Sequence, residues 1–126
     1  MSRRLLTFAA ASLAALPIAC VMPQQDSGPA LPAKFTALGT EPFWAAKVDD
    51  GILLYQTPEN QAGKRVAVTR RAVGARVEFS GTLDGASLAL VIGAGPCSDG
   101  MSDTVYFHSA ELRIGRQVLN GCAKPR

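Results

Sequence analysis

Residues 76–92 read RVEFSGTLDGASLALVI, and this stretch decides the fold. Val77 and Phe79 alternate with polar neighbours, and a second run places an apolar residue at every other position from 88 to 92. Alternation of this kind buries one face of a strand and leaves the other in water. Asp84-Gly85 separates the two runs, and this dipeptide favours the tight turn of a hairpin. The stretch therefore predicts an antiparallel β-hairpin.

The same alternation recurs along most of the chain, with turn residues between the runs. Hairpin-linked strands without a helical period predict an all-β protein, built as a small antiparallel meander. Closing into a roughly eight-stranded barrel would hide the edges of such a sheet, and a β-sandwich is the alternative. The expected strands are 35–38, 42–48, 51–56, 65–71, 75–82, 86–93, 104–114 (one bent strand or two) and 117–122.

The composition restricts the class of protein. The chain has 126 residues, which suits one folded domain, and 48% of them are hydrophobic, which is too many for a disordered chain. Lys and Arg number 13 against 10 Asp and Glu, a net charge of +3. This excess is too mild for a nucleic-acid-binding protein, so we expect no nucleic-acid partner.

The first 19 residues have the layout of an export signal. Arg3 and Arg4 precede an apolar run over residues 5–16, which is too short to span a bilayer as a helix. A signal helix over residues 1–19 is expected, and a buried N-terminal helix is the alternative. Without this segment the chain keeps 11 Lys and Arg against the same 10 Asp and Glu, so the exported part is nearly neutral.

Cys20 follows the apolar run directly, after Ala19, and this arrangement is similar to the lipobox of bacterial lipoproteins. The resemblance implies a lipid on the Cys20 thiol, although Pro17 stands where such motifs usually have Leu. Cleavage near Ala19 without lipid is the alternative and would give a soluble periplasmic protein. Val21 follows, rather than the Asp that resembles an inner-membrane retention signal, so outer-membrane anchoring facing the periplasm is expected. Residues 20–33 are rich in Pro and form a tether, and residues 34–126 form the domain.

Three cysteines are present. If Cys20 carries lipid, Cys97 and Cys122 remain, and an even pair in an exported chain predicts one disulfide. Two free thiols are the alternative. A zinc site is not expected, because there is no C-x-x-C and His108 is the single histidine. We expect neither a metal nor a cofactor.

Two motifs contain the candidate contact residues. In the first, Glu41 precedes Pro42, Phe43 and Trp44, the only Trp of the chain. Neighbouring residues of a strand point to opposite faces, so one ring enters the core and the other lies near the surface. Such a ring either contacts a ligand or plugs one end of the barrel.

The second motif is a loop of small polar residues after Cys97. Its Asp and Ser side chains can bond the local backbone and fix the turn, or can bind a ligand or partner. The candidate contacts in it are Ser98, Asp99, Met101, Ser102 and Asp103.

Catalysis is not expected from the remaining motifs. His108 has no G-x-S-x-G sequence to complete a Ser-His-Asp triad, so the chain is expected not to be an enzyme. The basic pairs Lys64-Arg65 and Arg70-Arg71 either contact an anionic surface, such as lipid headgroups or cell-wall polymer, or are solvated charges that protect a strand edge.

The two motifs together resemble a known family. Gly39-Thr40-Glu41-Pro42-Phe43-Trp44, then Cys97 to Asp103, then Gly121-Cys122, look like the signature of bacterial envelope lipoproteins to which no activity is assigned. This group is distantly similar to META-domain lipoproteins and c-type lysozyme inhibitor lipoproteins. The resemblance covers residues 35–123 and implies a small envelope β-domain with a Cys97–Cys122 bridge.

Three functions remain open from the sequence. The first is a non-enzymatic lipoprotein domain that faces the periplasm and binds an envelope protein or cell-wall component, or has a structural role. The second is an inhibitor of a lytic enzyme such as lysozyme, acting through the acidic loop 98–103. The third is a binder of a lipid or muropeptide at the barrel mouth near Trp44. The sequence defines no oligomeric state.

Overall fold

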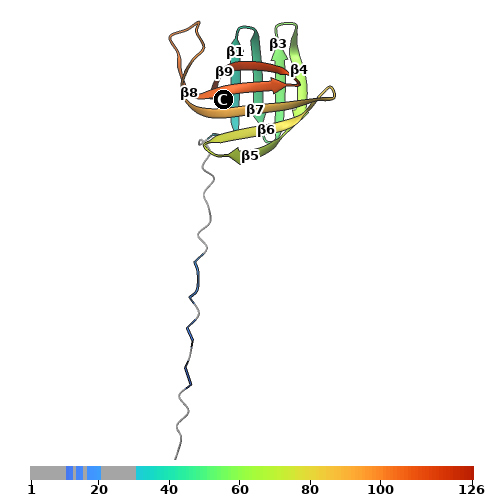
Figure 1. Cartoon of the computed structure of the whole chain (residues 1–126). Coiled ribbons are helices and arrows are strands. Elements are labelled where there is room, and N and C mark those ends of the chain that lie inside the picture. Colours follow the sequence, from blue (N-terminus) through green and yellow to red (C-terminus); the bar gives the residue numbers. More distant parts are fainter. Residues whose placement is uncertain (1–10, 13, 16, 21–30) are drawn as a thin grey trace, which may run out of the picture.

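The computed structural model describes residues 11, 12, 14, 15, 17–20 and 31–126. Within this part the chain is all-β, with nine antiparallel strands and no helix (Figure 1). The strands are β1 (Lys34–Thr40), β2 (Phe43–Asp49), β3 (Ile52–Thr57), β4 (Asn60–Ala67), β5 (Thr69–Val73), β6 (Arg76–Leu83), β7 (Ala86–Ser98), β8 (Val105–Ile114) and β9 (Gln117–Pro125).

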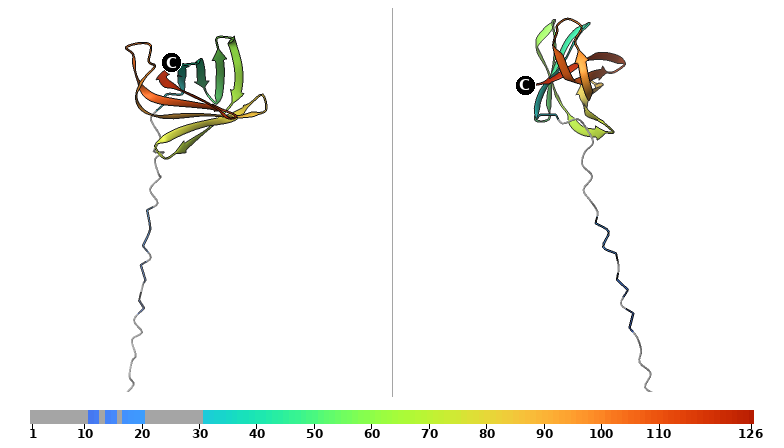
Figure 2. Two further views of the ribbon diagram at one scale, coloured as in Figure 1. Left: turned by 45° about the horizontal axis from the view of Figure 1, so that its top comes forward. Right: turned by 90° about the vertical axis from the view of Figure 1, so that its left-hand side faces the viewer.

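All nine strands belong to one sheet, in the order β4-β3-β2-β1-β9-β8-β7-β6-β5. Every neighbour except the β1–β9 pair is joined by a hairpin, so the predicted antiparallel meander is confirmed. The sheet curls into a half-barrel, and β1–β4 run across the direction of β6–β9 (Figures 1 and 2). The two crossing halves enclose the core between them.

The strand count differs from the expected eight because the run 65–71 is broken. Val68 lies outside both strands and separates β4 from β5. Its N–H donates to the carbonyl of Gly51 at 2.9 Å, next to the Ile52–Ala67 pair at the end of the β3–β4 ladder. From Thr69 onward the chain pairs with β6 instead. The run 104–114 is one strand, and the run 86–93 continues to Ser98.

The curled sheet closes by contact rather than by a complete hydrogen-bonded ring. β4 and β5 are its two edges, and no ladder joins them in the described part of the chain. Gly81 of β6 lies against β4 instead, where a Cβ atom would be 2.4 Å from the carbonyl oxygen of Ala67 and 2.8 Å from Cγ1 of Val66. Only glycine permits this approach, so Gly81 lets the two halves meet.

The core follows the predicted alternation. Leu88, Leu90 and Ile92 are all fully buried, and Val77 and Phe79 of the facing strand point to the same side. Phe79 contacts Phe35 of β1 with ring centroids 5.3 Å apart, so an aromatic pair joins the two halves of the sheet.

Trp44 packs over the backbone where β1 and β9 lie side by side. A Cβ atom on Gly39 would be 2.1 Å from Nε1 of Trp44, and one on Gly121 would be 3.0 Å from its Cζ2 and 1.9 Å from the carbonyl oxygen of Leu38. The indole is only 4% exposed. Glycine at both positions is therefore a condition for the burial of Trp44.

The predicted signal helix and tether fall mainly on positions outside the described residues. Residues 11, 12, 14, 15 and 17–20 are exposed and have no regular secondary structure, and Cys20 among them is a free thiol. The described residues contain no helix of the length and hydropathy needed to cross a membrane.

Replacing Gly121 with Ala should destabilise the domain, because the added methyl group meets the Leu38 carbonyl and the Trp44 ring. Overpacking of this kind costs about 1–3 kcal/mol. Urea unfolding followed by the fluorescence of Trp44 measures the loss. The control is Thr82→Ala at an exposed position of β6, which should change the free energy of unfolding by less than about 0.5 kcal/mol. Equal stabilities of the two variants would contradict the packing argument.

Candidate functional site

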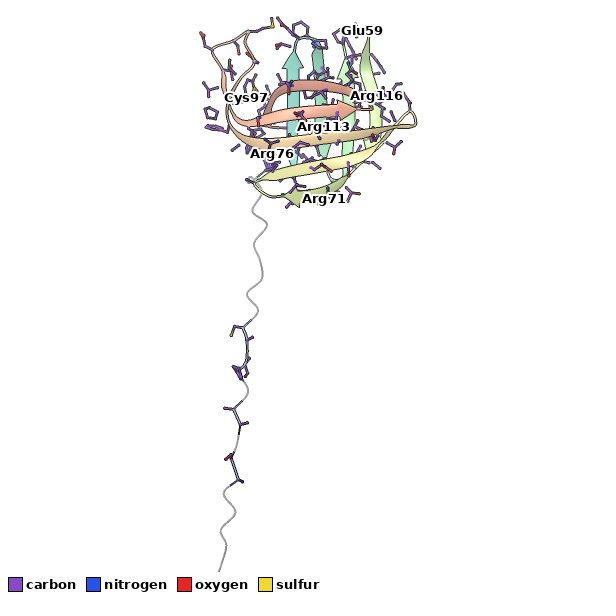
Figure 3. The ribbon with its side chains drawn as sticks, in the orientation of Figure 1. Glu59, Arg71, Arg76, Cys97, Arg113 and Arg116 are labelled. Atoms are coloured by element: carbon purple, nitrogen blue, oxygen red, sulfur yellow. A yellow bond between two sulfur atoms is a disulfide. The ribbon has the colours of Figure 1, made fainter. Side chains whose placement is uncertain are left out.

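The β7–β8 hairpin extends beyond the rest of the sheet. The β6–β7 ladder ends at Ile92, and the β8–β9 ladder begins at His108. Beyond these points Cys97 pairs with Tyr106 and Ser98 with Val105, after a register shift, and no further strand is hydrogen-bonded to these residues in the described part of the chain. They form a two-stranded ribbon that carries the loop 99–104 away from the half-barrel, with Cys97 near its base (Figures 1 and 3).

Three segments from distant parts of the sequence meet at this end of the molecule. They are the β1–β2 turn, the end of β7 with its loop, and the middle of β9, and they surround a cavity of about 400 Å³. We call this region the loop end. Its cavity is lined by Gly39, Thr40, Glu41, Cys97, Ser98, Asp99, Gly100, Met101, Asn120 and Gly121.

The Asp99 carboxylate organises the loop. One oxygen accepts hydrogen bonds from the backbone N–H groups of Met101 and Ser102, both at 2.9 Å. The other accepts from the Ser102 hydroxyl at 2.9 Å and the Tyr106 hydroxyl at 3.1 Å. The Asp99 carbonyl in turn accepts from the Thr40 hydroxyl at 2.8 Å. A single residue thus fixes the turn, ties it to β8 and joins it to β1.

These contacts change the acidity of both partners. The N–H groups of Met101 and Ser102, and then the Ser102 hydroxyl, lower the pKa of Asp99 to about 2, because each stabilises the carboxylate. Burial raises the pKa of Tyr106, and the hydrogen bond and negative charge of Asp99 raise it further. At neutral pH the pair is a phenol donating to a carboxylate.

The predicted disulfide is present between Cys97 and Cys122, with Cα atoms 5.7 Å apart. It joins the end of β7 to β9 across the base of the projecting ribbon. The bridge and the Thr40–Asp99 hydrogen bond hold the loop from two sides. A covalent link that spans 25 residues also restricts the unfolded chain.

Phe43 and Trp44 point to opposite faces, as predicted. Trp44 is buried, while Phe43 is 51% exposed. Both border a second hollow of about 410 Å³, together with Ala45, Gln56, Thr57, Pro58 and Gln61. This hollow shares no lining residue with the cavity of the loop end, and the binding of a lipid or muropeptide near Trp44 stays a prediction.

The loop end exposes large apolar side chains. Met101 at the tip is 66% exposed, and Val105 and Phe107 on the ribbon are 64% and 79% exposed. The sequence reasoning missed Val105 and Phe107. The signal was available, because Ala110 and Leu112 point inward and strand parity then turns every odd-numbered residue of this run outward.

The predicted contact residues are distributed over two places. Glu41, Ser98, Asp99 and Met101 line the cavity, and Ser102 and Asp103 are exposed on the loop above it. Phe43 and Trp44 border the second hollow. The two sequence motifs are thus neighbours in space, but Phe43 does not join the loop end.

His108 lies half-buried in β8, opposite Ala94 and Ala123. Its Nδ1 atom is buried and has no hydrogen-bond partner among the described residues. Within the same residues no three His, Cys, Asp or Glu side chains gather as metal ligands.

Comparisons with protein-family models, with curated proteins and with solved structures return no match for this chain.

The loop should lose its order only in strong acid. The pKa of Asp99 lies near 2 in the folded chain and near 3.8 when unperturbed, so the contribution of the carboxylate is complete above pH 3.8 and disappears as the pH falls through about 2. Amide chemical shifts of Met101 and Ser102, followed by NMR against pH, should titrate with a midpoint near 2. Asp99→Asn is the control and should remove this titration. A midpoint near 3.8 would contradict the hydrogen-bond network.

Proposed function

We propose that this chain is a non-enzymatic lipoprotein of the bacterial cell envelope that binds a partner protein in the periplasm through its loop end. The single observation that carries this proposal is a rigid projecting loop with exposed Met101, Val105 and Phe107. Val105 and Phe107 lie two positions apart on the outward face of β8, and adjoining exposed apolar side chains mark interaction sites on soluble domains. Met and aromatic side chains are also enriched in protein–protein interfaces.

The hydrogen bonds within the loop and the disulfide at its base support a role of the loop in binding. Asp99 and the Cys97–Cys122 bridge fix the loop before any partner arrives. A contact surface that is already ordered avoids the entropy cost of ordering during association.

The position of the loop end suits a partner located away from the membrane. The described chain joins β1 at Lys34, and Thr40 at the other end of the same strand bonds to Asp99. If Cys20 carries a lipid, the domain is attached at the end opposite to the loop (Figure 1). The disulfide agrees with an oxidising compartment such as the periplasm.

An inhibitor of a lytic enzyme is the second candidate, and the charge of the loop end favours it. Two exposed acids belong to the loop end. Glu41 lines its cavity together with Met101, and Asp103 lies two positions after Met101 in the loop. Lysozymes of the c-type are basic, so an acidic loop with an apolar tip is complementary to such an enzyme in charge. This candidate narrows the partner of the first proposal to one class of protein.

Photo-crosslinking in intact cells tests the binding surface. A photoreactive residue in place of Phe107 should give a defined adduct with another envelope protein, whereas the same residue in place of Thr82 should not. Asp99→Ala should reduce the Phe107 adduct, because the loop loses its fixed conformation. Equal adducts at the two positions, or none at Phe107, would overturn the proposed surface.

A lysozyme assay tests the second candidate separately. The purified domain at micromolar excess should slow cell-wall hydrolysis by a c-type lysozyme. Asp103→Lys should weaken the inhibition several-fold through charge repulsion. Glu59→Lys, which makes the same charge change at the β3–β4 turn, should leave it unchanged. If the unaltered domain does not inhibit the lysozyme, this candidate is excluded. The crosslinking experiment then decides whether the loop end binds another envelope protein.

A further inference from the structure

The β5–β6 hairpin carries a cluster of positive charge that the loop end does not use. Residues 69–77 include Arg70, Arg71 and Arg76 and contain no Asp or Glu. Residues 20–126 as a whole have a net charge of only +1, from 11 Lys and Arg against 10 Asp and Glu. This one segment therefore supplies a charge of +3, and the remainder of residues 20–126 sums to −2.

Two of these arginines share a face with an exposed valine. In the β5–β6 ladder Val73 lies opposite Arg76, and Arg71 lies opposite Glu78, so all four side chains point to the same side of the sheet. Val73 is exposed, and the Arg71 side chain is 70% exposed even though its guanidinium lies 3.5 Å from Glu78. The turn between Val73 and Arg76 is Gly74-Ala75, which adds no charge.

This hairpin lies at the end of the molecule where the described chain joins β1. All three views place the β5–β6 turn beside residues 31–33 (Figures 1 and 2). Arg71 and Arg76 lie on this lower side, whereas Arg113 and Arg116 lie further up (Figure 3). The basic hairpin and the point where the N-terminal segment joins β1 therefore lie at the same end of the molecule, opposite to the loop end.

We propose that Arg71, Val73 and Arg76 form a contact surface for anionic phospholipid headgroups. The arginines attract the phosphates, at about fivefold in partition coefficient for each cation near an anionic surface. Val73 at the uncharged turn enters the boundary between headgroups and acyl chains. The contact is too weak to anchor the domain alone, but it sets the orientation of a domain that is already tethered. The loop end then points away from the bilayer.

Vesicle binding of the unlipidated domain tests the surface directly. All nine strands and the disulfide lie within residues 34–125, so a chain of residues 21–126 keeps every described contact of the sheet. It should sediment with vesicles of phosphatidylethanolamine and phosphatidylglycerol and remain free with phosphatidylcholine vesicles. High salt should release it, because the attraction is electrostatic.

A pair of matched double variants separates the surface from net charge. Arg71→Gln with Arg76→Gln should lower the partition coefficient on anionic vesicles about 25-fold. Arg113→Gln with Arg116→Gln removes the same charge at the β8–β9 end and should retain most of the binding. Circular dichroism confirms that both variants fold. Equal losses in the two variants, or no binding by the unaltered domain, would overturn the proposal, and neither result bears on the loop end.

Discussion

The packing of Trp44 onto glycine backbone is the contact on which the loop end depends. Gly39 and Gly121 leave space for the indole, and this space sets how closely β1 approaches β9. The approach puts Thr40 within hydrogen-bond distance of the Asp99 carbonyl and puts Cys122 in position to bridge Cys97. The packing of the core and the conformation of the loop therefore depend on the same residues.

The architecture separates two kinds of surface. The half-barrel buries its apolar residues between crossing halves, but the ribbon of β7 and β8 continues past the point where its neighbours end. Val105 and Phe107 lie on the outward side of β8, so the same alternation that turns Tyr106 inward leaves them exposed. The arginine-rich hairpin occupies the other end of the molecule. The two proposed contacts thus face in opposite directions.

Period-two alternation predicted most of the strands and the inward face of each, and the cysteine count predicted the bridge. Alternation does not show where a strand ends, which is why the length of β7 was missed, whereas the outward position of Phe107 follows from the parity of its strand. The break at Val68 marks a change of pairing partner, from β3 before it to β6 after it, and alternation carries no information on pairing partners. The sequence also does not predict the role of Gly39 and Gly121, because this role depends on the close approach of β1 and β9, which are not consecutive in the chain.

The antiparallel pairing of β1 with β9 has a mechanical consequence for a tethered protein. A pull from the N-terminal side acts on β1 at Lys34, and a pull from the loop acts on β9 through the Cys97–Cys122 bridge. The two forces run in opposite directions along adjacent strands, so they load the hydrogen bonds of this ladder in shear and all at once. Resistance of this kind would suit the proposed arrangement, in which the domain is anchored at one end and binds a partner at the other.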